Sequence, residues 1–223
     1  EIGFKGMVEV SLFADLLTLK EALEFDKDIN NERDFQLTSC CCPMWIAMIR
    51  KLYPEFLSHV PNAVSPMVAT GRVIKKMVPD AVTVFLGPCL AKKSEAREED
   101  IKDAIDVVLT FEEINAIFEV AKIDEKNLKS DLREHSSRAG RIYAVTSGVS
   151  EAVKSTVDRI RPEKPIKVRA VQANGVVECK RLLNDLKNGD VKANFYEGMG
   201  CVGGCVGGPK AIINRDIAAE KVK

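Results

Sequence analysis

Hydrophobic and polar residues divide the chain into two kinds of segment. Short apolar runs of strand length occur at 35–39, 81–86, 105–109, 142–145, 166–171 and 193–197. Apolar residues recur at helical spacing in 14–25, 43–53, 66–77, 111–121, 149–160 and 175–186. Strands that alternate with helices indicate an α/β fold, with mixed or mostly parallel sheets flanked by helices.

Boundary residues support several of these elements. Ser65 and Pro66 are typical of a helix start, Pro54 ends the helix before it, and Thr110 caps the next one. The runs 81–86 and 105–109 are continuously apolar, as in strands that are buried on both faces. We also expect an extended segment at 6–13, a long surface excursion at 122–141 and a last helix from Pro209.

The helix predicted at 14–25 is amphipathic. Leu16, Leu19 and Leu23 lie on one of its faces. Glu21 and Glu24 are one helical turn apart, so their carboxylates project to the same side. From spacing alone, the simplest interpretation of these two glutamates is a solvated helix face.

Composition excludes several classes of function. The 223 residues include 33 acidic and 33 basic side chains, so no net field attracts nucleic acid or an anionic membrane. No apolar run reaches the roughly 18 residues of a membrane span, and no signal peptide is recognisable. We expect one compact cytoplasmic unit. Because the chain does not begin with Met, we expect it to be a fragment of a longer protein.

The seven cysteines indicate metal binding or catalysis. An odd number, with three in a row at 40–42, does not suit a disulfide framework in a cytoplasmic protein. Cys179 is the exception, because its apolar neighbours at helical spacing indicate a buried core thiol. The segments at 40–42, 89 and 201–205 each follow a predicted strand. Since ligands bind beyond the carboxyl ends of parallel strands, these segments can converge on one site.

The glycine-rich segment 197–210 places Cys201 and Cys205 in a C-x3-C spacing. Glycine permits unusual backbone angles and close approach to a bulky group. The chain has no C-x2-C zinc knuckle, so an iron–sulfur cluster, zinc and a metal-free catalytic thiol all stay open. The glycines favour the cluster. Neither His59 nor His135 is an evident partner for a catalytic thiol.

Three segments resemble the three signatures of the catalytic domain of iron-only (FeFe) hydrogenases. They are Thr-Ser-Cys-Cys-Cys-Pro-Met-Trp at 38–45, Gly-Pro-Cys-Leu-Ala-Lys-Lys-Ser-Glu at 87–95 and Glu-Gly-Met-Gly-Cys-Val-Gly-Gly-Cys at 197–205. They occur in the family's order, and weak similarity extends from Ile2 to about Lys210. The resemblance implies that residues 1–223 form an H-cluster domain with two lobes and the cluster site at their interface.

The resemblance also implies the ligands of the cofactor. Cys42, Cys89, Cys201 and Cys205 match the four ligands of a 4Fe–4S cubane. Cys205 matches the cysteine that also bridges to a two-iron subsite bearing CO and cyanide. The cubane and the subsite together form the H-cluster.

Three further residues match the proton path of the family. Cys41 matches the free thiol that relays protons to the subsite, and Glu21 and Glu24 match two glutamates of the path. Splitting of dihydrogen releases protons, so it needs titratable groups leading to water. Thiols and carboxylates serve this role once burial moves their pKa values toward neutrality.

The loop after the second predicted strand and the glycine-rich loop supply the remaining matches. Lys92 matches a lysine that donates a hydrogen bond to a cyanide ligand. Glu95 matches a carboxylate that pairs within the same loop. Met199 matches a methionine that packs on the two-iron subsite.

Several positions depart from the family pattern. Gly87 stands where methionine is common, Pro61 where the proton path has a serine, and Cys40 where serine is common. The third signature ends in Gly-Gly-Pro-Lys at 207–210 instead of Gly-Gly-Gly-Gln. The family's first strand and helix, and the ferredoxin-like modules that bring electrons, are absent from this sequence. These differences indicate a divergent subgroup.

We therefore expect a ferredoxin-type hydrogenase domain, with activity that is low. It would interconvert H2 with protons, exchange electrons with ferredoxin or another iron–sulfur carrier, and depend on maturation proteins for its cofactor. Protein made without maturation proteins is expected to carry little or no metal. The alternatives are a non-catalytic iron–sulfur assembly factor and an H2 sensor. Assembly factors lack the free cysteine beside the ligand, so Cys41 and Lys92 favour the enzyme.

Overall fold

The computed structural model describes residues 2–38, 41–124, 127 and 136–222. Its described strands form two parallel sheets. The first sheet has the order β1-β5-β4, and the second pairs β2 with β3. The bounds are β1 (Gln36–Leu37), β2 (Val84–Gly87), β3 (Val107–Thr110), β4 (Ala170–Asn174) and β5 (Phe195–Met199). The α/β fold predicted from the sequence is confirmed.

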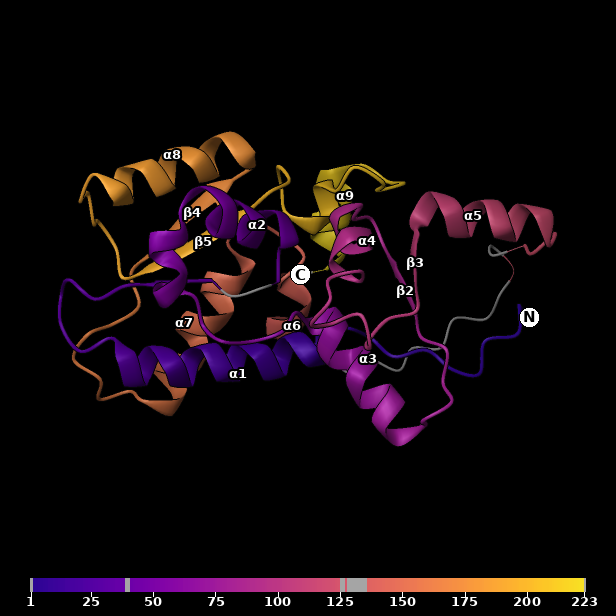
Figure 1. Cartoon of the computed structure of the whole chain (residues 1–223), viewed down its shortest axis with the longest axis horizontal. Helices are drawn as coiled ribbons and strands as arrows, with labels where there is room; N and C mark the ends of the chain where they lie inside the picture. The colour runs from indigo at the N-terminus through magenta and orange to yellow at the C-terminus, as the bar shows by residue number, and fades with distance from the viewer. Residues whose placement is uncertain (1, 39–40, 125–126, 128–135, 223) are drawn as a thin grey trace.

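Helices flank both sheets, as Figure 1 shows. In Figure 1, α8 covers one face of β4 and β5, α7 and α1 lie on the other, and β2, β3 and α5 are at the far end. The helices are α1 (Ser11–Asp28), α2 (Pro43–Leu52), α3 (Pro66–Met77), α4 (Ala91–Glu95), α5 (Phe111–Val120), α6 (Arg138–Ile142), α7 (Gly148–Ile160), α8 (Val176–Lys187) and α9 (Arg215–Lys221). Two short 3-10 helices are η1 (Pro54–His59) and η3 (Cys205–Gly207).

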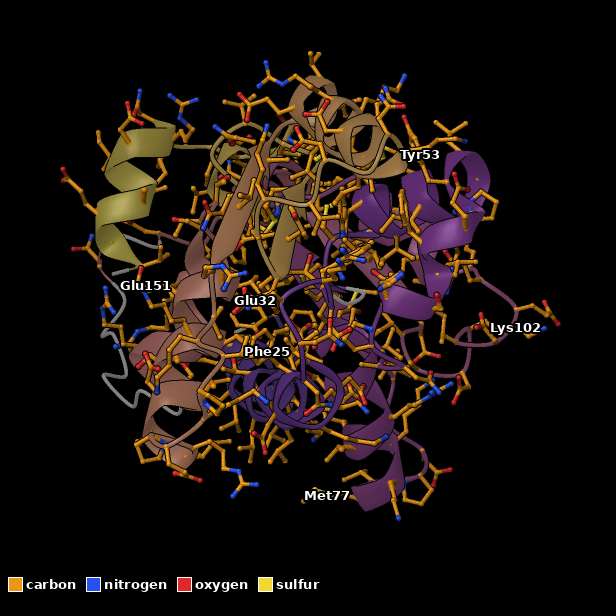
Figure 2. The ribbon with its side chains drawn as sticks, turned by 90° about the vertical axis from the view of Figure 1, so that its left-hand side faces the viewer. Phe25, Glu32, Tyr53, Met77, Lys102 and Glu151 are labelled. Atoms are coloured by element: carbon orange, nitrogen blue, oxygen red, sulfur yellow. The ribbon has the colours of Figure 1, made fainter. Side chains whose placement is uncertain are left out.

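Strand β5 separates two hydrophobic cores. Its side chains alternate between the faces of the sheet: Phe195 and Met199 pack in the core with α1 and α7, and Tyr196 packs in the core with α2 and α8. Phe25 of α1, which is labelled in Figure 2, meets Phe195 edge to face, with ring centroids 6.3 Å apart. A third, smaller core joins α3 to the segment before β3. The strand that leads into the glycine-rich loop is therefore fixed from both sides.

The predicted helix caps are present. The Ser65 hydroxyl accepts a hydrogen bond from the Val68 N–H at 3.4 Å. Thr110 and Glu113 form a reciprocal capping box at the start of α5. These local signals explain why α3 and α5 begin where the sequence predicted.

Four predicted elements differ from the structure. The segment 142–145 is not a strand, because Ile142 ends α6 and the next residues form the turn into α7. The last helix starts at Arg215 instead of Pro209, because the Asn214 side chain caps it through the N–H groups of Asp216 and Ile217. The segment 6–13 is not extended throughout, since α1 begins at Ser11. Strand β4 lies at 170–174, displaced from the predicted 166–171.

Two burial predictions are also wrong. The Leu16, Leu19 and Leu23 face of α1 is exposed, and the core contacts come from the opposite face. Strands β2 and β3 are not buried on both faces, because Leu86 and Val107 are exposed. The sheet of β2 and β3 has two described strands, so it is covered less completely than the larger sheet that the apolar runs suggested. The segment predicted at 122–141 lies largely outside the described residues.

The described helices include none that is long and apolar enough to cross a membrane. The three cysteine segments follow β1, β2 and β5, as the sequence predicted. Because all described pairings are parallel, each segment leaves the carboxyl end of its strand. The segments after β1 and β5 leave the same edge of one sheet, and Cys89 follows β2 of the second sheet.

Candidate iron–sulfur site

Four thiols from three distant segments influence one another electrostatically. Cys42 is the residue before α2, Cys89 lies between β2 and α4, and Cys201 and Cys205 follow β5. Burial raises the pKa of Cys201, and the nearby Cys42 and Cys89 raise it further. The pKa of Cys89 is likewise raised, first by burial and also by Cys42. The four sulfurs therefore gather in one region.

Cys205 is the most strongly perturbed of these thiols. Burial raises its pKa to about 12, with added contributions from Cys42, Cys89 and Cys201, whereas Lys92 lowers it. The Cys205 residue nevertheless has exposed surface. The thiol is thus crowded by protein atoms while part of the residue stays accessible. That position suits a ligand of a group enclosed by the protein.

Backbone N–H groups point at two of the sulfurs. The Gly200 N–H donates to Cys42 Sγ at 3.3 Å. The N–H groups of Lys92 and Ala91 donate to the Cys89 sulfur and lower its pKa against the effect of burial. Such donors stabilise thiolates, and hydrogen bonds to sulfur tune iron–sulfur clusters.

The glycine-rich loop is packed too tightly for side chains. Gly204 has φ +86°, and a Cβ there would lie 2.7 Å from the Thr146 backbone nitrogen. A Cβ on Gly200 would lie 2.6 Å from Met44 Cβ. The glycines therefore let the backbone that carries Cys201 and Cys205 rest directly on its neighbours.

The donor set suits a cluster better than a single ion. Within the described ranges, no group of three His, Cys, Asp or Glu side chains is close enough to hold one metal ion. A tetrahedral zinc site needs such a compact group. Four thiols that influence one another electrostatically, with Lys92 beside them, fit an iron–sulfur cluster, which four cysteine thiolates can hold.

Lys92 is a buried cation beside these thiols. It is 7% exposed, and its Nζ lies 2.7 Å from Glu95 Oε2. Burial lowers the pKa of Lys92, but Glu95, Cys205 and Cys89 outweigh this effect and raise it. The ammonium has three donors, and Glu95 is the one partner that the described residues give it, so donors are left for a further acceptor. A buried charged donor of this kind fits an anionic group held by the cysteines.

The predicted proton-path residues lie on α1 and just before α2. Glu21 is fully buried, so the solvated-face interpretation is wrong for this residue. Glu24 is half-buried, and its Oε1 lies 2.8 Å from Lys20 Nζ near the surface. Cys41 is half-buried and packs against the core that contains α1. The roles of these residues stay predictions.

Met199 and Gly87 occupy different surroundings. Met199 is 2% exposed, within the core shared with α1 and α7. At Gly87, an added Cβ would lie 2.9 Å from the ring of Phe85. That ring therefore fills the space beside the glycine that stands where the family commonly has methionine. The role of Met199 stays a prediction, and Cys40 lies outside the described residues.

Cys179 and His59 both pack as structural residues. Cys179 is fully buried in the core between α2 and α8, as predicted. The His59 ring stacks on Phe35, with centroids 3.9 Å apart, and its Nδ1 lies 3.0 Å from the Phe35 carbonyl oxygen. These contacts leave His59 without a role beside the thiols. His135 lies outside the described residues.

Glu197 and Asn174 hold the cysteine loop, and the sequence analysis missed both. The carboxylate of Glu197 accepts N–H hydrogen bonds from Ser147 and Ser150 at the start of α7, each 2.8 Å long. The Asn174 Oδ1 accepts from the Gly203 N–H at 2.7 Å and meets the Thr146 hydroxyl at 2.9 Å. A carboxylate inside the apolar run 195–199 was the available signal for Glu197.

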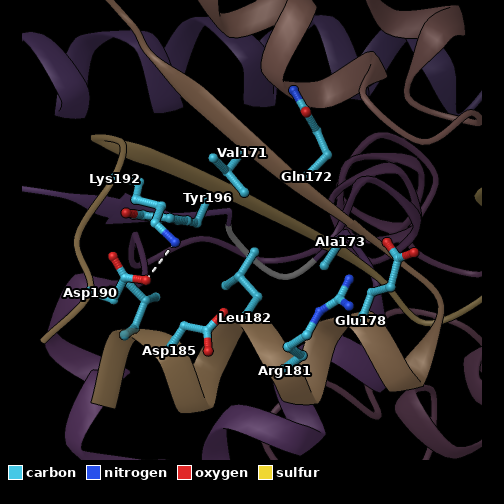
Figure 3. Close-up of a pocket in the computed structure, with 11 residues that line it drawn as sticks. Val171, Gln172, Ala173, Glu178, Arg181, Leu182, Asp185, Asp190, Lys192 and Tyr196 are labelled. Atoms are coloured by element: carbon cyan, nitrogen blue, oxygen red, sulfur yellow. Dashed lines mark ion pairs between the residues drawn. The ribbon is translucent and has the colours of Figure 1, made fainter. Parts of the chain in front are cut away.

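A cavity of about 200 Å³ lies elsewhere, between β4 and α8 (Figure 3). Its lining includes Leu182 and Tyr196 but none of the predicted site residues. Lys192 and Asp190 form an ion pair of 2.6 Å at its rim. This cavity is separate from the cysteine site.

Comparison with known proteins decides the family. Residues 1–209 match the family described as "Iron only hydrogenase large subunit, C-terminal domain". The chain belongs to this family. It is 28% identical to iron hydrogenase 1 of Clostridium pasteurianum over an alignment that covers the whole chain and 46% of that protein. The chain thus spans about half the length of this relative.

Non-hydrogenase relatives match as well. The chain is 32% identical to the cytosolic Fe-S cluster assembly factor NAR1 of Saccharomyces cerevisiae, over 67% of this chain and 34% of that protein. Among solved structures, a variant of the [FeFe]-hydrogenase HydA1 from Chlamydomonas reinhardtii superimposes with a TM-score of 0.75 at 23% identity. That match covers 99% of this chain and 73% of the other, and it shows the shared fold.

Proposed function

We propose that the chain is the H-cluster domain of a hydrogenase that interconverts H2 with protons and electrons. Cys42, Cys89, Cys201 and Cys205 would hold the 4Fe–4S cubane, and Cys205 would also hold the two-iron subsite. The observation that carries the proposal is the gathering of these thiols beside one buried cation, Lys92. The C-x3-C loop brings Cys201 and Cys205 to that place on a backbone packed against its neighbours.

The H-cluster, when bound, would supply the two-electron chemistry of H2 ⇌ 2H⁺ + 2e⁻. Lys92 would donate a charge-assisted hydrogen bond to its anionic ligands, with Glu95 fixing the ammonium from the other side. Met199 would contribute an apolar contact from β5. These residues bind and orient the cofactor, and they do not need to move.

The protons would travel through Cys41, Glu21 and Glu24. Glu24 lies near the surface beside Lys20 and would exchange protons with water. Glu21 is buried on the same helix, three residues earlier, and would pass a proton between Glu24 and Cys41. Positioned acid–base groups of this kind contribute roughly 10²–10⁴-fold to a rate. Pro61 cannot contribute a hydroxyl to this route.

The wider setting of the protein follows from the same proposal. Ferredoxin or another iron–sulfur carrier would exchange electrons with the cubane, and maturation proteins would deliver the two-iron subsite. The protein would work in the cytoplasm under anaerobic conditions. The relatives that support these partners are iron hydrogenase 1 and the "NADP-reducing hydrogenase subunit HndD" of Solidesulfovibrio fructosivorans, which is 25% identical over 93% of this chain.

An assembly-factor function is the second candidate, because the identity to NAR1 proteins reaches 32%. Such a protein would hold the cubane without the two-iron subsite. Cys41 and Lys92 favour the hydrogenase, because the family resemblance gives both of them a role at that subsite. An H2 sensor would keep the whole H-cluster but turn over slowly. Gly87 fits the sensor, because it lacks the methionine side chain that is common at this position in the family.

Infrared spectroscopy of anaerobically matured protein tests the function. We expect CO and cyanide stretching bands together with H2 production from a reduced iron–sulfur carrier. Cys41→Ala is expected to keep the bands and to lose roughly 10² of the rate or more, as for loss of an acid–base group. Cys179→Ala is the matched control, because that thiol is buried away from solvent in the α2 and α8 core.

The outcomes separate the candidates. A bound cubane without CO or cyanide bands after maturation would support the assembly factor and contradict the hydrogenase. Bands accompanied by slow turnover would support the sensor. Normal turnover in Cys41→Ala would show that this thiol does not carry the proton.

A further inference from the structure

Tyr143 is a buried polar residue that has no role in the function proposed above. It follows the last residue of α6, and its ring packs in the core with α1 and α7. The residue is 7% exposed. Its hydroxyl oxygen lies 2.9 Å from the Thr18 hydroxyl oxygen. Thr18 belongs to the buried face of α1, so this contact joins α6 to α1.

The Thr18 hydroxyl orients the Tyr143 hydroxyl. Thr18 Oγ1 also lies 2.8 Å from the Ala14 carbonyl oxygen, one turn earlier. A threonine hydroxyl has one hydrogen to donate. That hydrogen is directed at both the Ala14 carbonyl oxygen and the Tyr143 hydroxyl oxygen, so Tyr143 keeps its own hydrogen for another acceptor. The phenol ring is thereby anchored at a fixed place on α1.

This anchor lies one helical turn before Glu21. Residues three apart on a helix are neighbours, with Cβ atoms about 5–6 Å apart. Thr18 and Glu21 are both fully or almost fully buried, at 2% and 0% exposure, on the same face. The Tyr143 hydroxyl, fixed at Thr18, therefore lies on the buried face of α1 that also carries Glu21.

The titratable groups that face Tyr143 come from three elements. They are Glu21 of α1, Cys41 before α2, and Glu197 of β5. Burial raises the pKa of Tyr143 well above its ordinary value, and Glu21, Cys41 and Glu197 raise it further, while the Thr18 hydrogen bond lowers it. The phenol thus stays protonated. It is a neutral hydrogen-bonding group at the point where two predicted proton-path residues approach.

We infer that Tyr143 is a positioning residue for the proton step, which it serves by holding the Glu21 carboxyl group in place. Thr18 contributes by fixing the Tyr143 hydroxyl. The inference rests on the proposed function. The Tyr143 hydroxyl also provides a polar group near Glu21, on a proposed path where Pro61 has no hydroxyl.

The activity test compares Tyr143→Phe with wild-type matured protein. We expect kcat for H2 production to fall about tenfold, which is less than the roughly hundredfold loss expected for Glu21→Gln. The KM for the electron carrier should not change, because the carrier does not contact Tyr143. Thr18→Val should cause a similar loss, and the double variant should lose no more than the larger single effect. The CO and cyanide bands should stay in place.

Tyr53→Phe is the matched control. The Tyr53 hydroxyl is also part-buried and lies 3.0 Å from Asn184 Oδ1, but it belongs to the core with α2 and α8. This variant removes a similar hydroxyl from a different core than the one that holds Glu21. A merely structural role for Tyr143 would lower the melting temperature in both variants and leave the pH profile of kcat unchanged.

A second readout uses metal-free protein. The infrared carboxyl band that disappears in Glu21→Gln reports the titration of Glu21. In Tyr143→Phe we expect its midpoint to move to higher pH, because the carboxylate loses a nearby hydroxyl dipole. An unmoved midpoint together with unchanged kcat would overturn the inference. Absence of turnover in wild-type matured protein would instead overturn the proposed function, and the metal-free titration would still report on Tyr143.

Discussion

Glu197 provides a stability test that needs no cofactor. Its carboxyl group is fully buried beneath the cysteine loop. Burial raises its pKa from 4.5 to about 7, although hydrogen bonds from Ser150 and Ser147 act in the opposite direction. The folded protein therefore binds this proton more tightly than the unfolded chain. Its contribution to stability is complete below about pH 4.5 and is lost as the pH rises through about 7.

The size of this effect follows from the two pKa values. They differ by about 2.5, and each pKa unit corresponds to 1.36 kcal/mol, so ionisation costs up to about 3 kcal/mol of folding free energy. Glu197→Gln replaces the carboxyl group with a neutral group of similar shape. The stability of wild type relative to this variant should fall by up to about 3 kcal/mol between pH 4.5 and pH 8.

Urea unfolding at a series of pH values measures the difference. Titrations elsewhere in the chain cancel, because the two proteins share them. Glu151→Gln is the control, since Glu151 has an exposed side chain in the first turn of α7, the helix whose N–H groups bind Glu197. If the wild type instead gained stability relative to Glu197→Gln as the pH rose, the two N–H donors and the α7 dipole would outweigh burial. The reasoning about Glu197 would then be refuted.

Three further substitutions test the packing around the site. Lys92→Met should lower the free energy of unfolding by about 3–5 kcal/mol, because it leaves Glu95 buried without its partner, and adding Glu95→Leu should restore much of the loss; urea unfolding measures both. Gly198→Ala places a Cβ on the Trp45 ring and should cost about 1–3 kcal/mol in the same assay, whereas Gly6→Ala, with nothing within 4 Å, should cost little. Gly204→Ala, at φ +86°, should reduce the iron bound after anaerobic reconstitution more than Gly189→Ala, which is also at positive φ but in open space.

Local patterns predicted the elements that position the site. The helix starts at Ser65 and Thr110 are set by hydroxyl caps and are readable from a few adjacent residues. The cysteine loops after β1 and β5 leave the same edge of one sheet, so strand order accounts for their meeting, whereas Cys89 comes from the second sheet. Cys179 was recognisable as a core thiol from its apolar neighbours at helical spacing.

The remaining errors come from contacts between distant segments. The burial of Glu21 and the exposure of Leu16 depend on which face of α1 meets α6 and α7, and the helical pattern alone favoured the leucines. Residues 142–145 are apolar because the turn between α6 and α7 is buried, which resembles a short strand in sequence. The clamp of Glu197 on α7 joins residues about 50 positions apart, and no local rule predicts such a pair.

Iron binding by the four thiols is the central claim and can be measured directly. Anaerobic reconstitution with iron and sulfide should give about four irons per chain and the electron paramagnetic resonance signal of a reduced cubane. Four single variants should each diminish the bound iron: Cys42→Ser, Cys89→Ser, Cys201→Ser and Cys205→Ser. Cys179→Ser should leave it unchanged. One zinc per chain, or equal iron in all five variants and the wild type, would contradict the account.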